Sequence, residues 1–307
     1  MDDTARLDVG DTAAQRAQRK ALILLLTGAA AISCSAIFVR LSELGPVATA
    51  FWRVALAAPA LGLWLAAEQR HLGPAARRPR TARDWGWLLL AGFCYAGDLA
   101  TWHWSIKLTS VANSTLLANF APVFVTPAAY LLFGERITPA FLIGLVLAIA
   151  GAALVMGDSL SLSTAHLAGD GLAIVTAAFY AGYFLVLRHL RRVFSTATIM
   201  TWSAVVTVIL LLPLAAASGE SLVAVTAFGW TILVLLALIS HVGGQSLIAY
   251  AFAHLPASFS SVALLLQPTL AAVLAWLILG ESLGWLQGLG GALVLLGIAT
   301  ARRGSDA

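Results

Sequence analysis

Charged side chains are scarce in this sequence of 307 residues: Asp, Glu, Lys and Arg together make up 10% of it. A typical soluble domain contains about 25% charged residues, so the composition excludes an ordinary cytosolic enzyme, a disordered chain and a coiled coil. The net charge is +4, and the basic residues behind it are spread over several segments instead of forming one face. We therefore expect no nucleic-acid partner.

Cysteine is also nearly absent, because the chain has only Cys34 and Cys94. Both lie within apolar runs, so we expect buried side chains and no disulfide framework. The sequence shows no Walker A loop, and none of the HExxH or GxSxG motifs that assemble metal-binding or nucleophilic sites. We therefore expect a chain that is not an enzyme, with no cofactor, no metal ligands and no catalytic residues.

Apolar residues are abundant: 60% of the chain is hydrophobic, and its mean hydropathy is +0.91. A helix needs about 20 mostly apolar residues to cross about 30 Å of hydrocarbon. We predict an all-α integral membrane protein with ten transmembrane helices at 21–41, 47–67, 85–106, 111–133, 140–156, 171–187, 196–216, 228–252, 258–279 and 285–300. Only Arg53 and Asp98 lie well inside these spans, where a charge costs at least about 2.5 kcal/mol.

The basic residues predict the orientation in the membrane. Fifteen of the 18 Lys and Arg residues lie in the two terminal segments and in every second loop, whereas Arg40 and Lys107 lie on the opposite side. Cytoplasmic segments carry such an excess, so we predict cytoplasmic tails at 1–20 and 301–307. The loops at 157–170 and 217–227 are then expected outside.

The sequence also contains an internal repeat. LLFGERIT at 131–138 recurs as LILGESLG at 277–284, and at the same offset of 146 residues Pro122 matches Pro268, Gly144 matches Gly290 and Gly151 matches Gly297. We predict two five-helix repeats, 21–156 and 171–300. An odd number of helices brings the second repeat in from the other face, so the repeats are inverted, as in secondary transporters with a site near the membrane midplane.

These features resemble a known family. The ten helices, the two Gly-Glu turns after Pro-containing helices, GDGLAIVTAAFYAGYF at 169–184 and FWR at 51–53 resemble the EamA family of the drug/metabolite transporter superfamily. Within it the chain is similar to the YddG-type exporters of amino acids. The resemblance implies inverted repeats around a central cavity in the bacterial cytoplasmic (inner) membrane, which move small metabolites outward. It is specific for the superfamily and much weaker for the substrate.

Polar residues inside the spans are the candidate site. Tyr95, Asp98 and Trp102 are spaced i, i+3, i+7 and share one helix face, and the repeat places His241 at the position of Tyr95. We predict a substrate site formed by Tyr95, Asp98, Trp102, Asn119, His241, Gln245 and Gln267. For Asn119 and Gln267, hydrogen bonding between helices is an equal alternative.

Charged and titratable residues in the spans suggest a second role. Arg53 and Asp98 reach a similar depth, which favours an ion pair, while the alternative is that Arg53 extends outward and Asp98 is protonated. We predict an ion pair or proton coupling among Arg53, Asp98, His103 and His241. Pro122, Pro127 and Pro268 each interrupt a helix, which fits either a hinge or gate or a static kink.

The sequence favours a secondary transporter that exports small metabolites, amino acids of aromatic or other neutral type above all, by alternating access. The alternatives are a membrane receptor or scaffold that transports nothing, and a transporter of drugs or nucleotide-linked sugars. The expected partners are a small-molecule substrate and the lipid bilayer. The oligomeric state stays open, and the sequence is compatible with a monomer.

Overall fold

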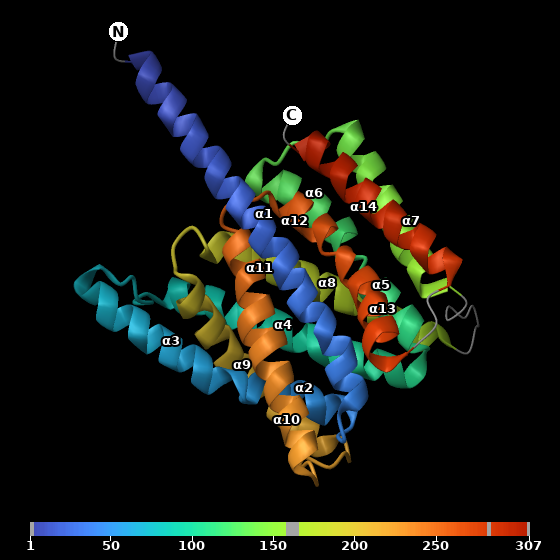
Figure 1. The fold of residues 1–307 in the computed structure, drawn as a ribbon. Helices are drawn as coiled ribbons and strands as arrows, with labels where there is room; N and C mark the ends of the chain where they lie inside the picture. Colours follow the sequence, from blue (N-terminus) through green and yellow to red (C-terminus); the bar gives the residue numbers. More distant parts are fainter. Residues whose placement is uncertain (1–2, 158–165, 281–283, 306–307) are drawn as a thin grey trace.

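A computed structural model describes residues 3–157, 166–280 and 284–305, and every regular element in these ranges is a helix. The helices run in the order α1 (Asp3–Leu41), α2 (Pro46–Ala55), α3 (Ala57–Leu72), the 3-10 turn η1 (Gly73–Ala75), α4 (Ala82–Leu108), α5 (Val111–Ala118), α6 (Ala121–Phe133), α7 (Pro139–Met156), α8 (Leu167–Leu190), α9 (Thr196–Ala217), α10 (Ala227–Leu235), the π-helix η4 (Leu236–Gln245), α11 (Ser246–Ala251), α12 (Ala257–Ala263), α13 (Leu266–Leu279) and α14 (Trp285–Ser305). Figure 1 shows them gathered in one bundle, with the start of α1 projecting from it. The predicted all-α class is confirmed.

Nine helical segments of the described ranges are long and apolar enough to cross a membrane, and they coincide with nine of the ten predicted spans. The remaining predicted span, 85–106, lies inside α4, which has 27 residues but includes Asp98, Thr101 and His103. These polar residues lower the hydropathy of α4, so length and apolar character alone do not establish ten crossings.

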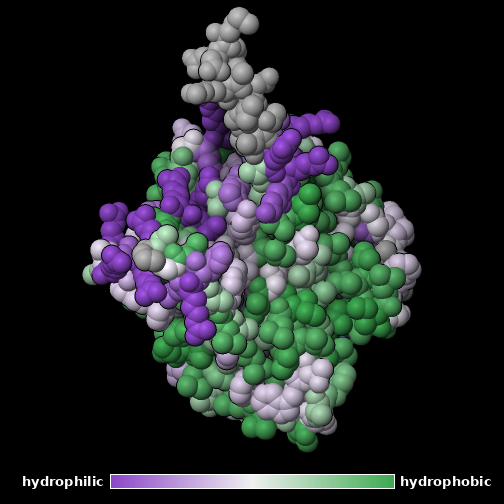
Figure 2. Space-filling model, turned by 60° about the vertical axis from the view of Figure 1, so that its left-hand side comes forward, coloured by the Kyte–Doolittle hydropathy of each residue, from purple (hydrophilic) through white to green (hydrophobic). Residues whose placement is uncertain are grey.

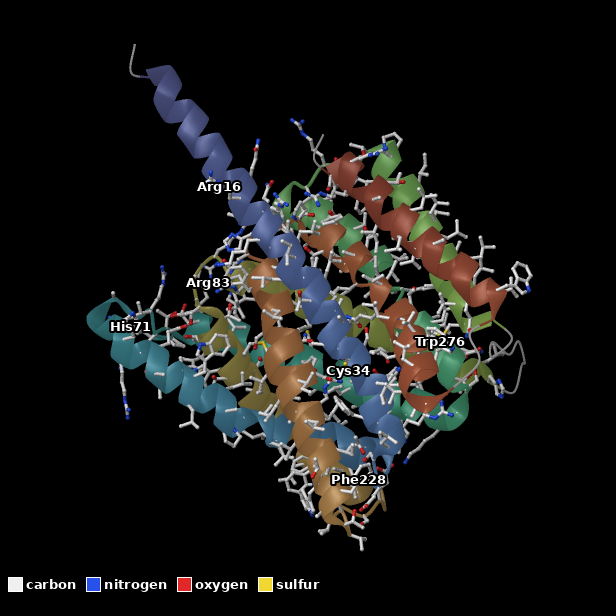
Figure 3. The ribbon with its side chains drawn as sticks, in the orientation of Figure 1. Arg16, Cys34, His71, Arg83, Phe228 and Trp276 are labelled. Atoms are coloured by element: carbon white, nitrogen blue, oxygen red, sulfur yellow. The ribbon has the colours of Figure 1, made fainter. Side chains whose placement is uncertain are left out.

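The surface of the bundle is that of a multi-pass membrane protein. Large apolar side chains face outward over much of it, and Leu131 and Leu63 are 77% and 74% exposed. In Figure 2 such residues cover broad parts of the visible face, while hydrophilic residues gather toward one end and one side. Figure 3 places Arg16 and Arg83 toward that end and Phe228 at the opposite end.

Helix starts and stops follow local chemistry. Thr81 begins α4 with a reciprocal cap, because its hydroxyl accepts from the Asp84 N–H and the Asp84 carboxylate accepts from the Thr81 N–H. Gly134 and Gly280 end α6 and α13 with φ of +68° and +67°, a left-handed conformation that favours glycine. The glycine of the repeated Gly-Glu turn therefore has the same local structure in both copies.

Several predicted spans are broken helices. The span at 47–67 divides into α2 and α3 at Leu56, because Pro59 has no N–H to donate to the carbonyl of Ala55. The span at 111–133 divides into α5 and α6 directly before Pro122. The span at 258–279 divides into α12 and α13 directly before Pro268. The repeat therefore breaks the chain at matched positions in its two copies.

The α7 and α14 helices lie side by side along one edge of the bundle (Figure 1). A Cβ atom added at Gly144 would lie 2.6 Å from the Gly297 carbonyl oxygen, and one added at Gly151 would lie 2.6 Å from that of Gly290. Only glycine permits so close an approach of two backbones. Gly144 thus contacts the counterpart of Gly151, and Gly151 contacts the counterpart of Gly144.

Candidate functional site

The described part of the bundle encloses a cavity of about 590 Å³ between α1, α2, α4, α5, α8, η4 and α13. Its wall is formed by Ile32, Ser33, Ser35, Ala36, Val39, Arg40, Pro46, Thr49, Ala50, Arg53, Tyr95, Asp98, Leu99, Trp102, His103, Ile106, Thr115, Ala118, Asn119, Thr176, Tyr180, Leu236, Gln245, Gln267, Pro268 and Ala271. This volume and mixed lining suit a small molecule with both apolar and polar parts.

Most of the predicted site residues share this cavity. Six of the seven predicted substrate-binding residues line it, namely Tyr95, Asp98, Trp102, Asn119, Gln245 and Gln267. Arg53, His103 and Pro268 line it as well. His241, Pro122 and Pro127 are not among its lining residues. The sequence prediction placed the site on the third, fourth, eighth and ninth spans, and the cavity also has walls from α1, α2 and α8.

Arg53 and Asp98 lie on the wall of the same cavity, from α2 and α4. Among the described residues no ion pair joins these two side chains, and the Nε of Arg53 has no hydrogen-bond partner. The predicted proximity of the two charges therefore takes the form of a shared cavity. Charges inside a membrane protein usually find a partner, so this arrangement leaves both available to a bound molecule.

His241 is held by Tyr95. The Tyr95 hydroxyl and the Nδ1 of His241 form a hydrogen bond of 3.1 Å, and their rings lie 5.3 Å apart. His241 is 2% exposed, so it lies behind the cavity wall with Tyr95 in front of it. In this structure His241 contacts the cavity-lining residue Tyr95 and does not line the cavity itself.

The π-helix η4 brings two residues that lie nine positions apart to the same cavity. Nine residues of α-helix make about 2.5 turns, which would put Leu236 and Gln245 on opposite faces. The wider π-helix, with its i→i+5 hydrogen bonds, brings both to the cavity. Gly244, next to Gln245 in the chain, contacts α1, where its added Cβ would lie 3.0 Å from the Gly28 carbonyl oxygen.

The break between α5 and α6 uses Asn119, whose side-chain nitrogen donates to the Thr115 carbonyl at 2.8 Å. Asn119 thus stabilises the end of its own helix while it lines the cavity. At the matching break, the backbone carbonyl of Gln267 accepts a hydrogen bond of 3.1 Å from the Ser33 hydroxyl on α1. The Nε2 of Gln267 has no partner among the described residues.

Sequence reasoning missed the contribution of α1 and α8. Thr176 and Tyr180 of α8 both line the cavity, and Thr176 forms a hydrogen bond of 2.8 Å with Thr101 of α4. Their i, i+4 spacing puts them on one helix face, and this pattern alone would have indicated a polar face on α8. On α1, Ser33 donates to the Ala29 carbonyl in its own helix, so a buried hydroxyl there gives no signal of a cavity.

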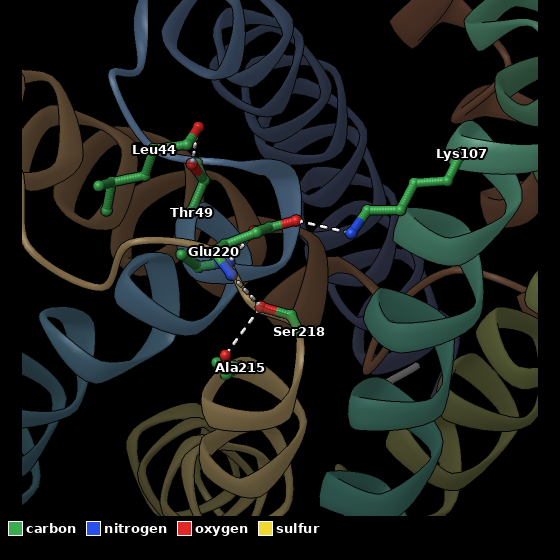
Figure 4. Close-up of polar contacts among 7 residues, drawn as sticks. Leu44, Thr49, Lys107, Ala215, Ser218 and Glu220 are labelled. Atoms are coloured by element: carbon green, nitrogen blue, oxygen red, sulfur yellow. Dashed lines mark hydrogen bonds and ion pairs between the residues drawn. The ribbon is translucent and has the colours of Figure 1, made fainter.

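Polar contacts fasten the two ends of the bundle. Near the mouth of the cavity, Lys107 and Glu220 form an ion pair of 2.9 Å (Figure 4), and Glu220 also accepts from the Ala48 N–H at 2.9 Å. At the opposite end, the Glu135 carboxylate accepts from the N–H groups of Ala257 and Ser258 at 2.7 and 3.0 Å. Among the described residues, no cluster of three or more His, Cys, Asp or Glu side chains is suited to hold a metal ion.

Comparison with known proteins points to one family. A model described as the EamA-like transporter family matches twice, at residues 19–157 and 167–302. A probable terminal-alkyne amino-acid exporter of Streptantibioticus cattleyicolor is 30% identical over 74% of this chain and 76% of its own. An uncharacterized transporter of Archaeoglobus fulgidus is 25% identical over 86% and 91%, and the pseudopaline exporter CntI of Pseudomonas aeruginosa is 27% identical over 68% and 72%. One solved crystal structure shares the fold, with a TM-score of 0.75 at 20% identity over 96% of this chain and 99% of that one.

Proposed function

Because the chain belongs to the EamA-like transporter family and is therefore a membrane transporter of small metabolites, not an enzyme, we propose that it exports amino acids with aromatic or other neutral side chains. The observation that carries this proposal is the pair of opposite charges, Arg53 and Asp98, on the wall of one cavity without an ion pair between them in the described part of the chain. An amino acid has an ammonium group for Asp98 and a carboxylate for Arg53. The names of two relatives, an amino-acid exporter and a pseudopaline exporter, support export.

The apolar part of the substrate would rest on the aromatic wall. Trp102 and Tyr180 face the cavity together with Leu99, Ile106 and Leu236. A largely apolar lining with few polar groups fixes a ligand while leaving its release possible. We therefore assign the substrate-binding role to Tyr95, Asp98, Trp102, Asn119, Gln245 and Gln267, and a supporting role to His241 through Tyr95. His103 and Asp98 are the candidate proton carriers.

The proposed fold is ten spans in two inverted repeats, 21–156 and 171–300, with α4 as the third span. The two matches of one family model and the paired glycines of α7 and α14 support it. An inverted arrangement requires that a contact between residue i of one repeat and residue j of the other recur with i and j exchanged. Gly144 with Gly297 and Gly151 with Gly290 satisfy this requirement.

The cavity extends toward the end of the bundle where α1 and α4 finish and α2 begins. Its lining includes Arg40 and Ile106, near the ends of α1 and α4, and no residue of α9 or α12. The predicted orientation, with both termini in the cytoplasm of the inner membrane, makes this end the outer one. The structure then corresponds to an outward-facing state, closed toward the cytoplasm by the contact of Glu135 with the start of α12.

Transport by alternating access needs flexible points, and the helix breaks before Pro122 and Pro268 are suited to this. Both prolines come directly after an interrupted helix and occupy equivalent positions in the repeats. Pro127 differs, because it lies inside α6 and lines a shallow apolar groove on the outer surface with Tyr130 and Leu142. We assign the hinge role to Pro122 and Pro268 first, and to Pro127 second.

Counterflow in proteoliposomes tests this function. Vesicles containing the purified protein are loaded with unlabelled phenylalanine, leucine or threonine, and entry of the labelled amino acid is followed. We expect counterflow for at least one of them, and a loss of at least tenfold in Asp98→Asn and Arg53→Gln. Thr231→Ala is the matched control, because this hydroxyl only bonds the Ala227 carbonyl in its own helix. Folded protein with no counterflow of any amino acid would refute the proposal.

A further inference from the structure

Tyr95 and His241 occupy equivalent positions in the two repeats and also touch each other. They are separated by 146 residues, the offset of the repeat, and their side chains form a hydrogen bond of 3.1 Å. Both are almost fully buried, at 3% and 2% exposure, where an unmade hydrogen bond is costly. Substrate binding explains neither the equivalent positions of the two residues nor the hydrogen bond between them, because His241 does not line the cavity.

Contact between equivalent residues has a geometric meaning. When two units are related by a two-fold axis, a residue meets its own counterpart only on that axis. The Tyr95–His241 pair therefore marks the pseudo-two-fold axis between the repeats. The α7–α14 crossing marks this axis a second time. Gly144 contacts Gly297, the counterpart of Gly151, and Gly151 contacts Gly290, the counterpart of Gly144.

We propose that Tyr95 and His241 are positioning residues that form the pivot of transport, an inference that rests on the alternating access proposed above. If the outward- and inward-facing states differ by an exchange of conformation between the two repeats, every contact of one state recurs in the other between the exchanged residues. The exchange carries the Tyr95–His241 contact onto itself. Its hydrogen bond is therefore kept in both states, and the repeats rotate about it.

Contacts away from the axis behave differently. Glu135 accepts hydrogen bonds of 2.7 Å from the Ala257 N–H and of 3.0 and 2.6 Å from the N–H and hydroxyl of Ser258. The offset of 146 residues relates Glu135 to position 281, and Ala257 and Ser258 to positions 111 and 112, so this contact is not carried onto itself. We expect the exchange to break it. Glu135 is thus the matched comparison: it joins the two repeats, as the Tyr95–His241 pair does, but off the axis.

The exchange also identifies a reporter for the inward-facing state. Val125 of α6 is 0% exposed and is the counterpart of Ala271, which lines the cavity. When the repeats exchange, position 125 becomes part of a cavity that opens to the cytoplasm. A cysteine at this position, in protein with Cys34→Ala and Cys94→Ala, then reacts with a membrane-impermeant maleimide at a rate proportional to the inward-facing population.

The experiment measures this rate in inside-out vesicles without substrate. In the Val125→Cys protein we expect Glu135→Ala to raise the labelling rate at least fivefold and Tyr95→Phe to change it less than twofold. The double variant Tyr95→Phe with His241→Leu, which removes both partners of the hydrogen bond, should also stay within twofold and covers the case that Tyr95→Phe folds poorly. The ¹⁵N shift of the His241 Nδ1 should be the same with and without Glu135→Ala.

Three results would overturn the pivot. One is a rise in labelling for Tyr95→Phe as large as that for Glu135→Ala, since the pair would then close one state only. Another is an unchanged rate in Glu135→Ala, because the exchange would not break the off-axis contact. The third is a parent protein that catalyses counterflow but never exposes position 125. A parent without any counterflow is a different result, because it refutes the proposed transport itself.

Discussion

The Nζ of Lys107, in the last turn of α4, lies 2.9 Å from a carboxylate oxygen of Glu220 in the loop after α9. The same carboxylate accepts a hydrogen bond from the Ala48 N–H, in the first turn of α2. Glu220 therefore joins three segments beside the cavity mouth. Partial burial would raise the pKa of Glu220, but the Ala48 N–H and Lys107 together hold it below its ordinary value.

Glu220 should matter more for stability than Lys107. Lys107 is 37% exposed, so its ion pair contributes about 1 kcal/mol or less, whereas Glu220→Ala also removes a helix cap that contributes about 1 kcal/mol more. We expect the loss of unfolding free energy in detergent to follow Glu220→Ala > Glu220→Gln ≥ Lys107→Met. An equal loss for Lys107→Met and Glu220→Ala would show that the cap contributes nothing.

Acid should loosen the link between Glu43 and the start of α10. The Thr226 hydroxyl and N–H, with the Val225 N–H, hydrogen-bond the carboxylate and hold the pKa of Glu43 below its ordinary value. A lowered pKa in the folded state gives stability that is present above the unfolded pKa and is lost as the pH falls through the folded one. We expect the protection factors of the Val225 and Thr226 amides, which are the intrinsic exchange rates divided by the observed rates at the same pH, to fall at acid pH, and no such fall in Glu43→Gln.

The α7–α14 crossing should not tolerate a side chain at Gly144. A Cβ there would lie 2.3 Å from the Ala301 backbone nitrogen, so Gly144→Ala forces the two helices apart. We expect a loss of about 1–3 kcal/mol in unfolding free energy. Gly62→Ala is the matched control, because a Cβ at Gly62 meets nothing within 4 Å and alanine favours the helix. Similar stability of the two variants would contradict the close packing.

Arg53 and Asp98 should be only weakly coupled in the empty protein. No ion pair joins them within the described ranges, although their opposite charges attract across the shared cavity, so the effects of Arg53→Gln and Asp98→Asn on unfolding free energy should add to within about 1 kcal/mol. A coupling above 1 kcal/mol in this double-mutant cycle would indicate a direct pair. The same two variants abolish counterflow if a substrate bridges the two charges, so stability and transport separate the alternatives.

The orientation is open to a labelling experiment. In protein with Cys34→Ala and Cys94→Ala, we expect Val225→Cys to react with an impermeant maleimide on intact cells, because Val225 is 92% exposed beside the predicted outer face. Ala75→Cys, exposed in the turn after α3, should react only after the cells are opened. The reverse pattern would invert the topology.

Local chemistry made much of the fold predictable. Runs of about 20 apolar residues locate the spans because the hydrocarbon core has a fixed thickness. The repeat matched Gly134 with Gly280, and both indeed have left-handed backbones. Asp98 and Arg53 stood out because charges are rare in spans, and both line the cavity.

It was harder to predict from the sequence which side chains face the cavity. The expected face of the eighth span assumed an α-helical period, while the π-helix η4 brings both Leu236 and Gln245 to the cavity. His241 does not line the cavity because it is hydrogen-bonded to Tyr95, a contact between distant segments that the sequence does not show. No rule of local composition predicts ten residues of π-helix. Tyr180 was missed because a tyrosine in an apolar run is equally suited to the core, and only the arrangement of α8 against α4 brings it to the cavity wall.

The reciprocal glycines of α7 and α14 also constrain how the sequence can drift. A larger residue at Gly144 would meet the backbone beside Gly297, and one at Gly290 would meet that beside Gly151. No single compensating change in a side chain can relieve either clash, because the obstructing atoms belong to the main chain. The two repeats can diverge in their polar residues, but the close backbone contact requires glycine at all four of these sites. The two sequences therefore stay alike there.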